Sequence, residues 1–346
     1  MASLAIDLLS QPTNDGKPAA AVKCPVCDGV CPGPALYRYT AEQAAAHFCP
    51  PTQNADRNRR LRESIERLWK GNDCEIVRCD QCGFAFGQPF VGGDESFYSI
   101  LLEEKSYPSW RWDYELALAA LEQTRPGKIL DIGAGVGMFL RGLGKDWQRF
   151  AVESSEVTRR ELEQSGIEVF RDLAEAARSH AGTFRVVTLF QVLEHIAEFD
   201  LVLEQCRQLL EPGGKLVITV PDGEAMIRQE RLTGCHDMPP NHINKWTGDS
   251  LTRVLRRNGF EPGRPVVEPR SWNALKANLH MRIRTDATNP NSLTAAAYRI
   301  RNRRLRIAVL ALLAGPAMAR MLPARSQLRQ GGAFGLISEK IDVSRT

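Results

Sequence analysis

The segment 128–140 holds the residues whose types and spacing most directly suggest chemistry. Two apolar residues are followed by Asp131, by glycines at 133, 135 and 137, and then by an apolar helix start. A strand that turns into a helix through glycines exposes backbone N–H groups to a ligand. The dinucleotide fingerprint places its third glycine three residues after the second, whereas here the step is two residues. A carboxylate at position 131 repels phosphate and attracts an ammonium or sulfonium group.

Elements that could position this turn follow along the chain. Strands are predicted over 149–153, 167–172 and 185–191, each separated from the next by a helical segment. This alternation predicts a parallel sheet with helices on both faces, so fold class α/β. Glu153 lies 22 residues after Asp131 at a predicted strand end, where an acid accepts hydrogen bonds from ribose hydroxyls. A ligand-free glycine turn is the alternative.

The D-x-G-x-G-x-G signature, together with Leu-x-Pro-Gly-Gly before a strand at 210–214, resembles class I S-adenosylmethionine-dependent methyltransferases. The resemblance covers 127–266 densely. It implies a Rossmann-like seven-stranded sheet whose last, antiparallel strand is 333–338, and it implies S-adenosylmethionine as cofactor. The cofactor-binding residues that it implies are Asp131, Gly133, Ala134, Gly135, Gly137, Glu153, Asp172 (toward the adenine) and Gln191. A nicotinamide-dependent oxidoreductase is opposed by the glycine spacing and by Asp131.

Two histidines follow predicted strand ends. His195 comes after Glu194, just beyond the fourth strand, and His242 lies in the loop after the fifth. The Leu-Glu-His sequence resembles the bacterial branch related to ubiquinone O-methyltransferases. We expect His195 or His242 to act as general base, with Glu194 orienting an imidazole. Some relatives bind a divalent metal here through two acids and histidines, but Gln191 replaces the first acid. A purely structural role for both histidines is the remaining reading.

Cysteines form two C-x-x-C pairs near the amino terminus: Cys24 with Cys27, and Cys79 with Cys82. Two such pairs can complete a tetrahedral, closed zinc site that supports folding. The long segment between them is predicted to hold helices over 40–47 and 54–69. Unpaired Cys31, Cys49 and Cys74 are competing ligands, and four unligated buried cysteines are the alternative.

An aromatic-rich stretch precedes the glycine turn and leads into a helix that ends near Gln123. In class I methyltransferases a helix at this place covers the methionine end of the cofactor. The resemblance therefore implies Tyr107, Trp110 and Arg111 as lid residues. Ordinary packing of these side chains is the alternative.

The carboxyl-terminal part is basic. No acidic residue occurs between Asp286 and Glu339, while eight arginines lie between 299 and 329, and a helix is predicted over 298–313. Residues 298–330 could lie on an anionic membrane surface, meet substrate phosphates or bind RNA. A helical cover over the acceptor site, with its arginines in solvent, is the favoured reading; it suits an anionic acceptor such as a nucleotide sugar. The longest apolar run, about 16 residues, is too short to span a bilayer.

Length, composition and charge limit the possible interpretations of these motifs. The chain of 346 residues has 43% hydrophobic and 25% charged residues and a net charge of +4. Nine cysteines without an export signal predict a reducing, cytoplasmic location. We expect a zinc-binding module over 20–95, a cofactor-binding core over 96–266, a basic helical cover over 267–330, and the last strand with a tail over 331–346.

The resemblance implies O-methylation of a small molecule or glycan precursor. An RNA methyltransferase that grips RNA through the cysteine module and arginine helix is an alternative, as is a non-catalytic scaffold that binds the cofactor. The cysteine module lacks the interleaved basic and aromatic side chains that stacking on bases requires, so nucleic acid is not expected as a partner.

Overall fold

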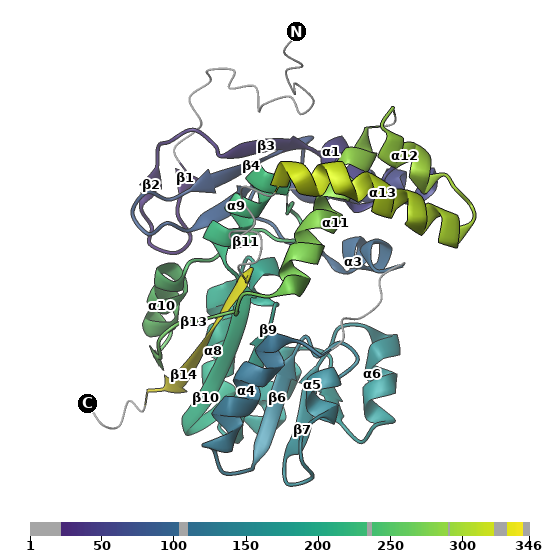
Figure 1. Cartoon of the computed structure of the whole chain (residues 1–346). Coiled ribbons are helices and arrows are strands. Elements are labelled where there is room, and N and C mark those ends of the chain that lie inside the picture. Colours follow the sequence, from purple (N-terminus) through teal and green to yellow (C-terminus); the bar gives the residue numbers. More distant parts are fainter. Residues whose placement is uncertain (1–21, 104–109, 234–236, 290, 322–330, 342–346) are drawn as a thin grey trace.

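A large twisted sheet forms the lower half of the molecule (Figure 1). The computed structural model describes residues 22–103, 110–233, 237–289, 291–321 and 331–341. The strand order along the sheet is β12-β14-β10-β9-β6-β7-β8, and β13 pairs with β14 beside this path. The strands are β6 (Lys128–Ile132), β7 (Gln148–Val152), β8 (Glu168–Phe170), β9 (Phe184–Phe190), β10 (Leu210–Pro221), β12 (Phe260–Pro262), β13 (Val266–Val267) and β14 (Ala333–Lys340).

The pairing confirms the predicted topology. Strands β8, β7, β6, β9 and β10 run parallel, and β14 runs antiparallel to β10 with Ile218 opposite Leu336. The predicted seven strands are all present, and the short β13 is the one addition. Since the carboxyl ends of parallel strands share one edge of the sheet, the loops after β6, β7 and β9 meet there.

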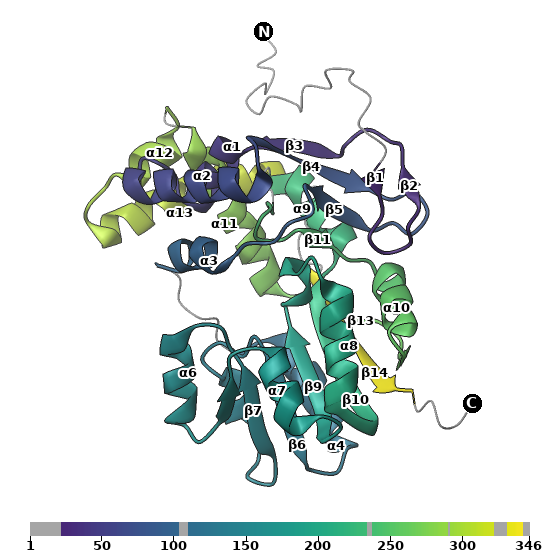
Figure 2. The same cartoon turned by 180° about the vertical axis from the view of Figure 1, so that it is seen from behind.

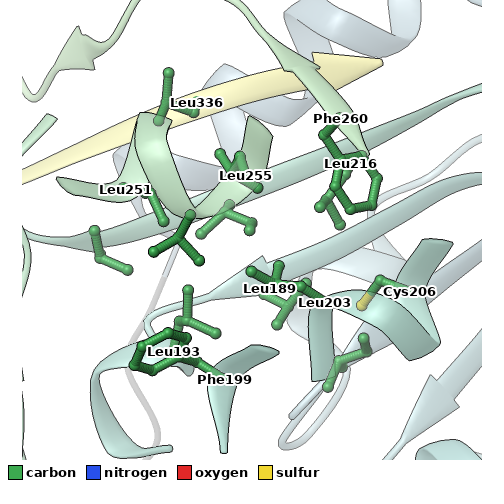
Figure 3. Packing of buried hydrophobic residues seen from close by; sticks show 14 of the residues in the cluster. Leu189, Leu193, Phe199, Leu203, Cys206, Leu216, Leu251, Leu255, Phe260 and Leu336 are labelled. Atoms are coloured by element: carbon green, nitrogen blue, oxygen red, sulfur yellow. The ribbon is translucent and has the colours of Figure 1, made fainter. Parts of the chain in front are cut away.

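Helices cover both faces of this sheet, as alternating strands and helices require. They are α4 (Trp112–Glu122), α5 (Met138–Arg141), α6 (Glu156–Glu163), α7 (Leu173–His180), α8 (Phe199–Leu209) and α10 (Gly248–Arg257). Figure 3 shows leucines of α8 and α10 packed with Leu189 and Leu216 from the sheet. These side chains are fully buried, so this layer holds the strand ends in place.

A second sheet, of four strands in the order β11-β5-β4-β3, lies above the first. Its strands are β3 (Tyr37–Thr40), β4 (Asp73–Arg78), β5 (Ala85–Gln88) and β11 (Asn244–Lys245), and the hairpin β1 (Val22–Lys23) with β2 (Val30–Cys31) lies at one end. Both predicted helices between the cysteine pairs are present as α1 (Ala41–Phe48) and α2 (Ala55–Trp69), followed by α3 (Glu95–Leu101). Strand β11 comes from the loop after β10, so one sheet joins the amino-terminal segment to the histidine loop.

The carboxyl-terminal insertion folds into helices joined by short non-helical segments. It consists of α11 (Trp272–Thr288), α12 (Leu293–Tyr298) and α13 (Arg303–Met321), and it lies beside α1 and α2 in both views (Figures 1 and 2). The helix predicted over 298–313 is present from Arg303 onward as part of α13, but its predicted start is wrong, because the chain breaks at 299–302 and restarts. Asn302 explains the restart, since its side chain accepts a hydrogen bond from the Leu305 N–H at 3.1 Å.

Candidate functional site

The glycine turn between β6 and α5 has the backbone that its sequence predicted. Gly133, Gly135 and Gly137 all have positive φ, at 70°, 52° and 71°. A Cβ at Gly133 would lie 2.8 Å from Val192 Cγ2, and one at Gly137 would lie 2.4 Å from Leu162 Cδ2. Glycine therefore suits both positions. The Gly133 N–H donates to the Val152 carbonyl at 2.8 Å and the Gly137 N–H to the Ala134 carbonyl at 3.0 Å, so these bonds fix the shape of the turn.

Asp131 lies buried beneath this turn. Thr188 of the neighbouring strand β9 donates its hydroxyl to Asp131 Oδ1 at 2.7 Å. Burial raises the pKa of Asp131 to about 7, although the Thr188 hydrogen bond acts in the opposite direction. A buried carboxylate with a raised pKa gains most from a cationic ligand, since the ligand replaces the solvation that burial removed.

Glu153 follows β7 and faces the same turn. Its carboxylate accepts the Gly135 N–H at 3.0 Å and the Ser155 N–H at 3.0 Å. Asp172, after β8, accepts the Glu175 N–H at 2.8 Å and so caps α7. Gly133, Glu153 and Asp172 line one cavity of about 390 Å³, within the usual size of small-ligand sites. The structure therefore brings together the residues expected at the ribose and adenine.

Two further expected residues lie around this turn. Ala134 donates its N–H to the Val152 carbonyl at 3.4 Å, which ties the turn to β7. Gln191, directly after β9, has φ +57°, a conformation rare for a side-chain-bearing residue. Its side chain donates to Thr219 Oγ1 at 3.4 Å. This left-handed residue redirects the chain from β9 into the segment that carries Glu194 and His195.

The expected lid residues are partly described. Arg111 pairs with the buried Asp113, its Nε donating to Oδ1 at 3.0 Å, and its guanidinium lies 5.1 Å from the Tyr114 ring centre. Trp110 packs edge-on against Tyr114 with 5.4 Å between ring centres. Tyr107 lies outside the described residues. Trp110 and Arg111 thus stand at the start of α4, the helix before the glycine turn.

Glu194, His195 and His242 form one compact cluster. Glu194 Oε1 lies 3.9 Å from His195 Nε2 and 4.0 Å from His242 Nε2, and the two imidazole centres are 4.6 Å apart. Glu194 is fully buried, and neither carboxylate oxygen has a hydrogen-bond partner among the described residues. Burial raises the pKa of Glu194 to about 7, an effect that the nearby His242 partly offsets.

The opposite nitrogen of each imidazole is held by an acceptor. His195 Nδ1 donates to the Asn241 carbonyl at 2.7 Å, and the Tyr98 hydroxyl lies 3.1 Å from the same nitrogen. His242 Nδ1 donates to Asp237 Oδ2 at 2.5 Å. With protons on both Nδ1 atoms, each neutral imidazole offers an Nε2 lone pair toward Glu194.

Asp237 has the orienting role that was expected of Glu194. Burial alone would raise the pKa of Asp237, but His242 and Lys245 hold it far below its usual range. Two opposing effects act on the pKa of His242. Burial lowers it, whereas the charge and the hydrogen bond of Asp237 raise it by more, so the pKa of His242 is raised. Sequence reasoning missed Asp237, although it lies only five residues before His242 in the same loop.

A buried ion pair fixes the loop that carries Asp237. Lys245 Nζ donates to Glu230 Oε1 at 2.7 Å, and both side chains are almost fully buried. The same Glu230 oxygen accepts the Asp237 N–H at 2.9 Å, and Lys245 also donates to the Asp237 carbonyl at 3.3 Å. These contacts connect β11 and α9 (Gly223–Thr233) through one polar network. No motif in the sequence indicated this pair.

The two cysteine pairs converge as their spacing predicted. The Sγ atoms of Cys24 and Cys82 are 3.6 Å apart, those of Cys27 and Cys79 are 3.5 Å apart, and all four lie within 4.8 Å of one another. The residue after each pair, Asp28 or Gly83, has positive φ, at 57° and 73°. The two turns therefore have matching geometry. Cys31, Cys49 and Cys74 lie outside this group of four.

Backbone contacts connect the cysteine segment to the histidine cluster. Gly87 of β5 donates to the Ile243 carbonyl at 2.9 Å, and Gly93 donates to the Pro240 carbonyl at 2.9 Å. The Ile243 N–H then donates to the Glu194 carbonyl at 3.0 Å. A Cβ at Gly92 would lie 2.3 Å from the His195 carbonyl oxygen, so only glycine allows this approach. The amino-terminal segment thus forms one wall of the cluster.

No described helix is both long enough and apolar enough to traverse a lipid bilayer.

Comparison with known proteins indicates a methyltransferase domain. Residues 109–262 match the family model described as a methyltransferase domain. The chain is 31% identical over 178 residues to the ubiquinone biosynthesis O-methyltransferase of Roseobacter denitrificans, covering 46% of this chain and 72% of that protein. The corresponding protein of Salmonella arizonae is 32% identical over 38% of this chain and 64% of its own length.

Solved structures are more distant in sequence. An S-adenosylmethionine-dependent methyltransferase from Mesorhizobium loti is 14% identical, with a TM-score of 0.41 over 66% of this chain and 98% of that one. The residues matched by the family model include the glycine turn, Glu153, Glu194, His195 and His242. This chain belongs to the class I S-adenosylmethionine-dependent methyltransferases.

Proposed function

We propose that the enzyme methylates a hydroxyl oxygen of a small molecule or glycan precursor. The observation that carries this proposal is the pair of imidazoles whose Nε2 atoms face a common point at the carboxyl end of β9, beside the expected cofactor site. A hydroxyl must lose its proton as it becomes an ether, so a nearby base suits an oxygen acceptor. The names of the relatives above, both O-methyltransferases, support the same choice.

The proposed reaction is one displacement. The acceptor oxygen attacks the methyl carbon of the sulfonium, the C–O bond forms, and the S–C bond breaks to leave a neutral thioether. The hydroxyl proton passes to an imidazole Nε2. We assign the base to His242, because Asp237 stabilises the charged form of its imidazole. His195, whose Nδ1 donates to the Asn241 carbonyl, is the second candidate.

A divalent cation at the same cluster is the second candidate for this step. Glu194 Oε1 and the two Nε2 atoms can each offer one ligand atom, and all lie within 4.8 Å of one another. The unpartnered carboxylate of Glu194 fits such an ion, and acceptors behind both Nδ1 atoms are typical of ligating histidines. Bound there, the ion would supply a Lewis acid that lowers the pKa of the acceptor hydroxyl.

We propose a structural zinc ion at Cys24, Cys27, Cys79 and Cys82. Zinc–sulfur bonds of about 2.3 Å in a tetrahedron give sulfur–sulfur edges of roughly 3.8 Å. The two measured edges, 3.5 and 3.6 Å, are close to that value. Burial raises the pKa of Cys24 and Cys82, whereas at Cys79 the N–H groups of Cys82 and Gln81 outweigh burial and lower the pKa to about 7. N–H donation of this kind favours the thiolate form, which is the form that binds zinc.

The histidine roles are tested by separating binding from turnover. Labelled methyl transfer from S-adenosylmethionine to the small-molecule fraction of a cell extract serves as the assay. His242→Ala is expected to lose on the order of 10²–10⁴ in turnover while calorimetry shows unchanged cofactor affinity. His180→Ala, at the end of α7 and outside the cluster, is the matched control and should keep full activity. Normal turnover in His242→Ala and His195→Ala would refute the general-base role.

Metal supplementation distinguishes the imidazole base from the divalent cation as the group that activates the acceptor hydroxyl. Protein is treated with a chelator, its zinc content is measured, and magnesium or manganese is then returned. Activity that depends on the added ion at constant zinc content would establish the cation at Glu194, His195 and His242. Activity that is indifferent to the ion supports the imidazole base. Methyl transfer into the RNA fraction, or none into any fraction, would contradict the small-molecule proposal.

A further inference from the structure

Helix α13 presents an apolar side to solvent. Its half-buried positions, which share one face at helical spacing, are Arg306, Val309, Leu310, Leu313 and Ala314. The packing partners of α13 within the insertion are α11 and α12. The opposite, exposed face consists of Leu305, Ile307, Ala308, Ala311, Leu312, Gly315 and Pro316. The side chains of Leu305, Ile307 and Leu312 are 54%, 55% and 78% exposed.

This face continues for about three turns of helix without a charged residue. Between Leu305 and Pro316 the only charged residue is Arg306, which is on the half-buried side. Isolated exposed leucines are common on protein surfaces, but a continuous exposed apolar side on one helix is not. Helix α13 is not long and apolar enough to cross a bilayer. A helix with these properties is typical of one that lies along an interface.

Positive charge gathers at the amino-terminal end of this face. Arg301, Arg303 and Arg304 are exposed, and among the described residues none of them pairs with a carboxylate. The sequence has no acidic residue from 287 to 338, and Asp286 at the end of α11 pairs with Arg282. Apolar side chains beside unpaired arginines match the two layers of an anionic lipid surface, its acyl chains and its phosphates.

We propose that α13 docks this enzyme on an anionic membrane surface. Leu305, Ile307 and Leu312 enter the acyl boundary, and Arg301, Arg303 and Arg304 meet the lipid phosphates. RNA would engage the arginines but leave the leucines in water, so the apolar face favours lipid. The matched family segment ends at residue 262, before this insertion begins, so the family resemblance says nothing of this surface. The inference is independent of which acceptor is methylated.

Vesicle flotation tests the proposal with the full chain. We expect binding to vesicles of phosphatidylcholine mixed with phosphatidylglycerol, weaker binding to pure phosphatidylcholine, and weakening by added salt. Replacing Arg301, Arg303 and Arg304 by serine should weaken binding to the anionic vesicles on the order of a hundredfold. Arg264→Ser, an exposed arginine outside the insertion, is the control and should leave binding unchanged.

The apolar half of the proposal has its own variants. Leu305→Glu with Leu312→Glu should lose vesicle binding by at least about a hundredfold, with unchanged melting temperature and cofactor affinity. Leu201→Glu on α8, 53% exposed in the wild type, is the matched control. Absence of binding to anionic vesicles would overturn the proposal. So would a concentration-dependent dimer that the leucine variants abolish without any vesicle binding, because the face would then cover a second copy of the chain.

Discussion

The cofactor half and the acceptor half of this site are built in different ways. Asp131, Gly135 and Glu153 come from two consecutive strand–helix turns, and Gly135 and Glu153, which are in contact, are 18 positions apart. The one longer contact of this half joins Asp131 to Thr188 on the adjacent strand β9. The histidine cluster joins segments far apart in the chain. His195 meets Tyr98 and Asn241, and these lie 97 and 46 positions away.

This difference predicts which substitutions would disrupt each half of the site. The glycine turn depends on its own strand and helix and on the end of the next strand, β7, since its hydrogen bonds go to Val152 and Glu153. The histidine loop depends on β5, on the Lys245–Glu230 pair and, through the second sheet, on the cysteine segment. We therefore expect changes in the acceptor half to reduce stability and turnover together, and changes in the cofactor half to reduce binding alone.

Loss of the cysteine site should have the largest effect. Cys79→Ala removes one of four ligands of the proposed zinc, and structural zinc stabilises small domains by about 10–16 kcal/mol in peptide systems. We expect metal analysis to find about one zinc per wild-type chain and a clear loss of zinc and of folded protein in the variant. Cys74→Ala, a buried cysteine outside the group of four, should keep its zinc. Equal melting temperatures for the metal-free and metal-loaded proteins would show that the site is not structural.

Breaking the buried ion pair should have the next largest effect. Lys245→Met leaves Glu230 charged and buried, which costs about 3–5 kcal/mol of unfolding free energy. Denaturant unfolding measures this value. Lys245→Met combined with Glu230→Leu should recover part of the loss, because no lone charge remains. Arg160→Met breaks an exposed pair with Glu156 and should change stability by no more than about 1 kcal/mol. A similar, small effect for both single variants would show that the acceptor half does not depend on this pair.

A change at Glu153 should weaken cofactor binding and leave the stability of the fold nearly unchanged. Glu153→Ala removes the acceptor expected for the ribose hydroxyls, and we expect S-adenosylmethionine binding to weaken by about 1–3 kcal/mol. Calorimetry measures the affinity, and unfolding should stay near the wild-type value. Glu156→Ala, exposed on α6, is the control. Tight binding of a dinucleotide without binding of S-adenosylmethionine would contradict the assignment of this turn.

Asp131 should make cofactor affinity depend on pH. Its pKa in the folded protein is raised to about 7 by burial. Below this pH the carboxyl is neutral and attracts the cofactor ammonium less, so affinity should rise about tenfold from pH 6 to pH 8. The same shift predicts that the unliganded protein loses stability as pH rises from about 4 to about 7, because the folded state then holds a proton that the unfolded state has released. In Asp131→Asn, cofactor affinity and stability should both depend less on pH. If either pH dependence persisted in this variant, it would have to come from another group.

Much of the fold could be predicted from local patterns. The parallel sheet with helices on both faces follows from alternating apolar strands and helices, and the antiparallel end strand follows from the family resemblance. The cysteine cluster could be predicted because paired thiols at C-x-x-C spacing each fix a tight turn. The break before α13 could not, since one asparagine cap separates two helices whose residues otherwise suit a continuous helix.

The sequence by itself determined the glycine turn, Asp131 and Glu153, because the contacts of this half are formed within one strand–helix unit and its neighbour. It also placed Glu194, His195 and His242 at strand ends. Only the tertiary structure decided that the three side chains meet, that Asp237 holds His242 and that β11 joins the amino-terminal sheet. The β11–β5 pairing and the approach of His242 to Glu194 depend on how distant segments pack, and such contacts leave no periodic signal in a single sequence.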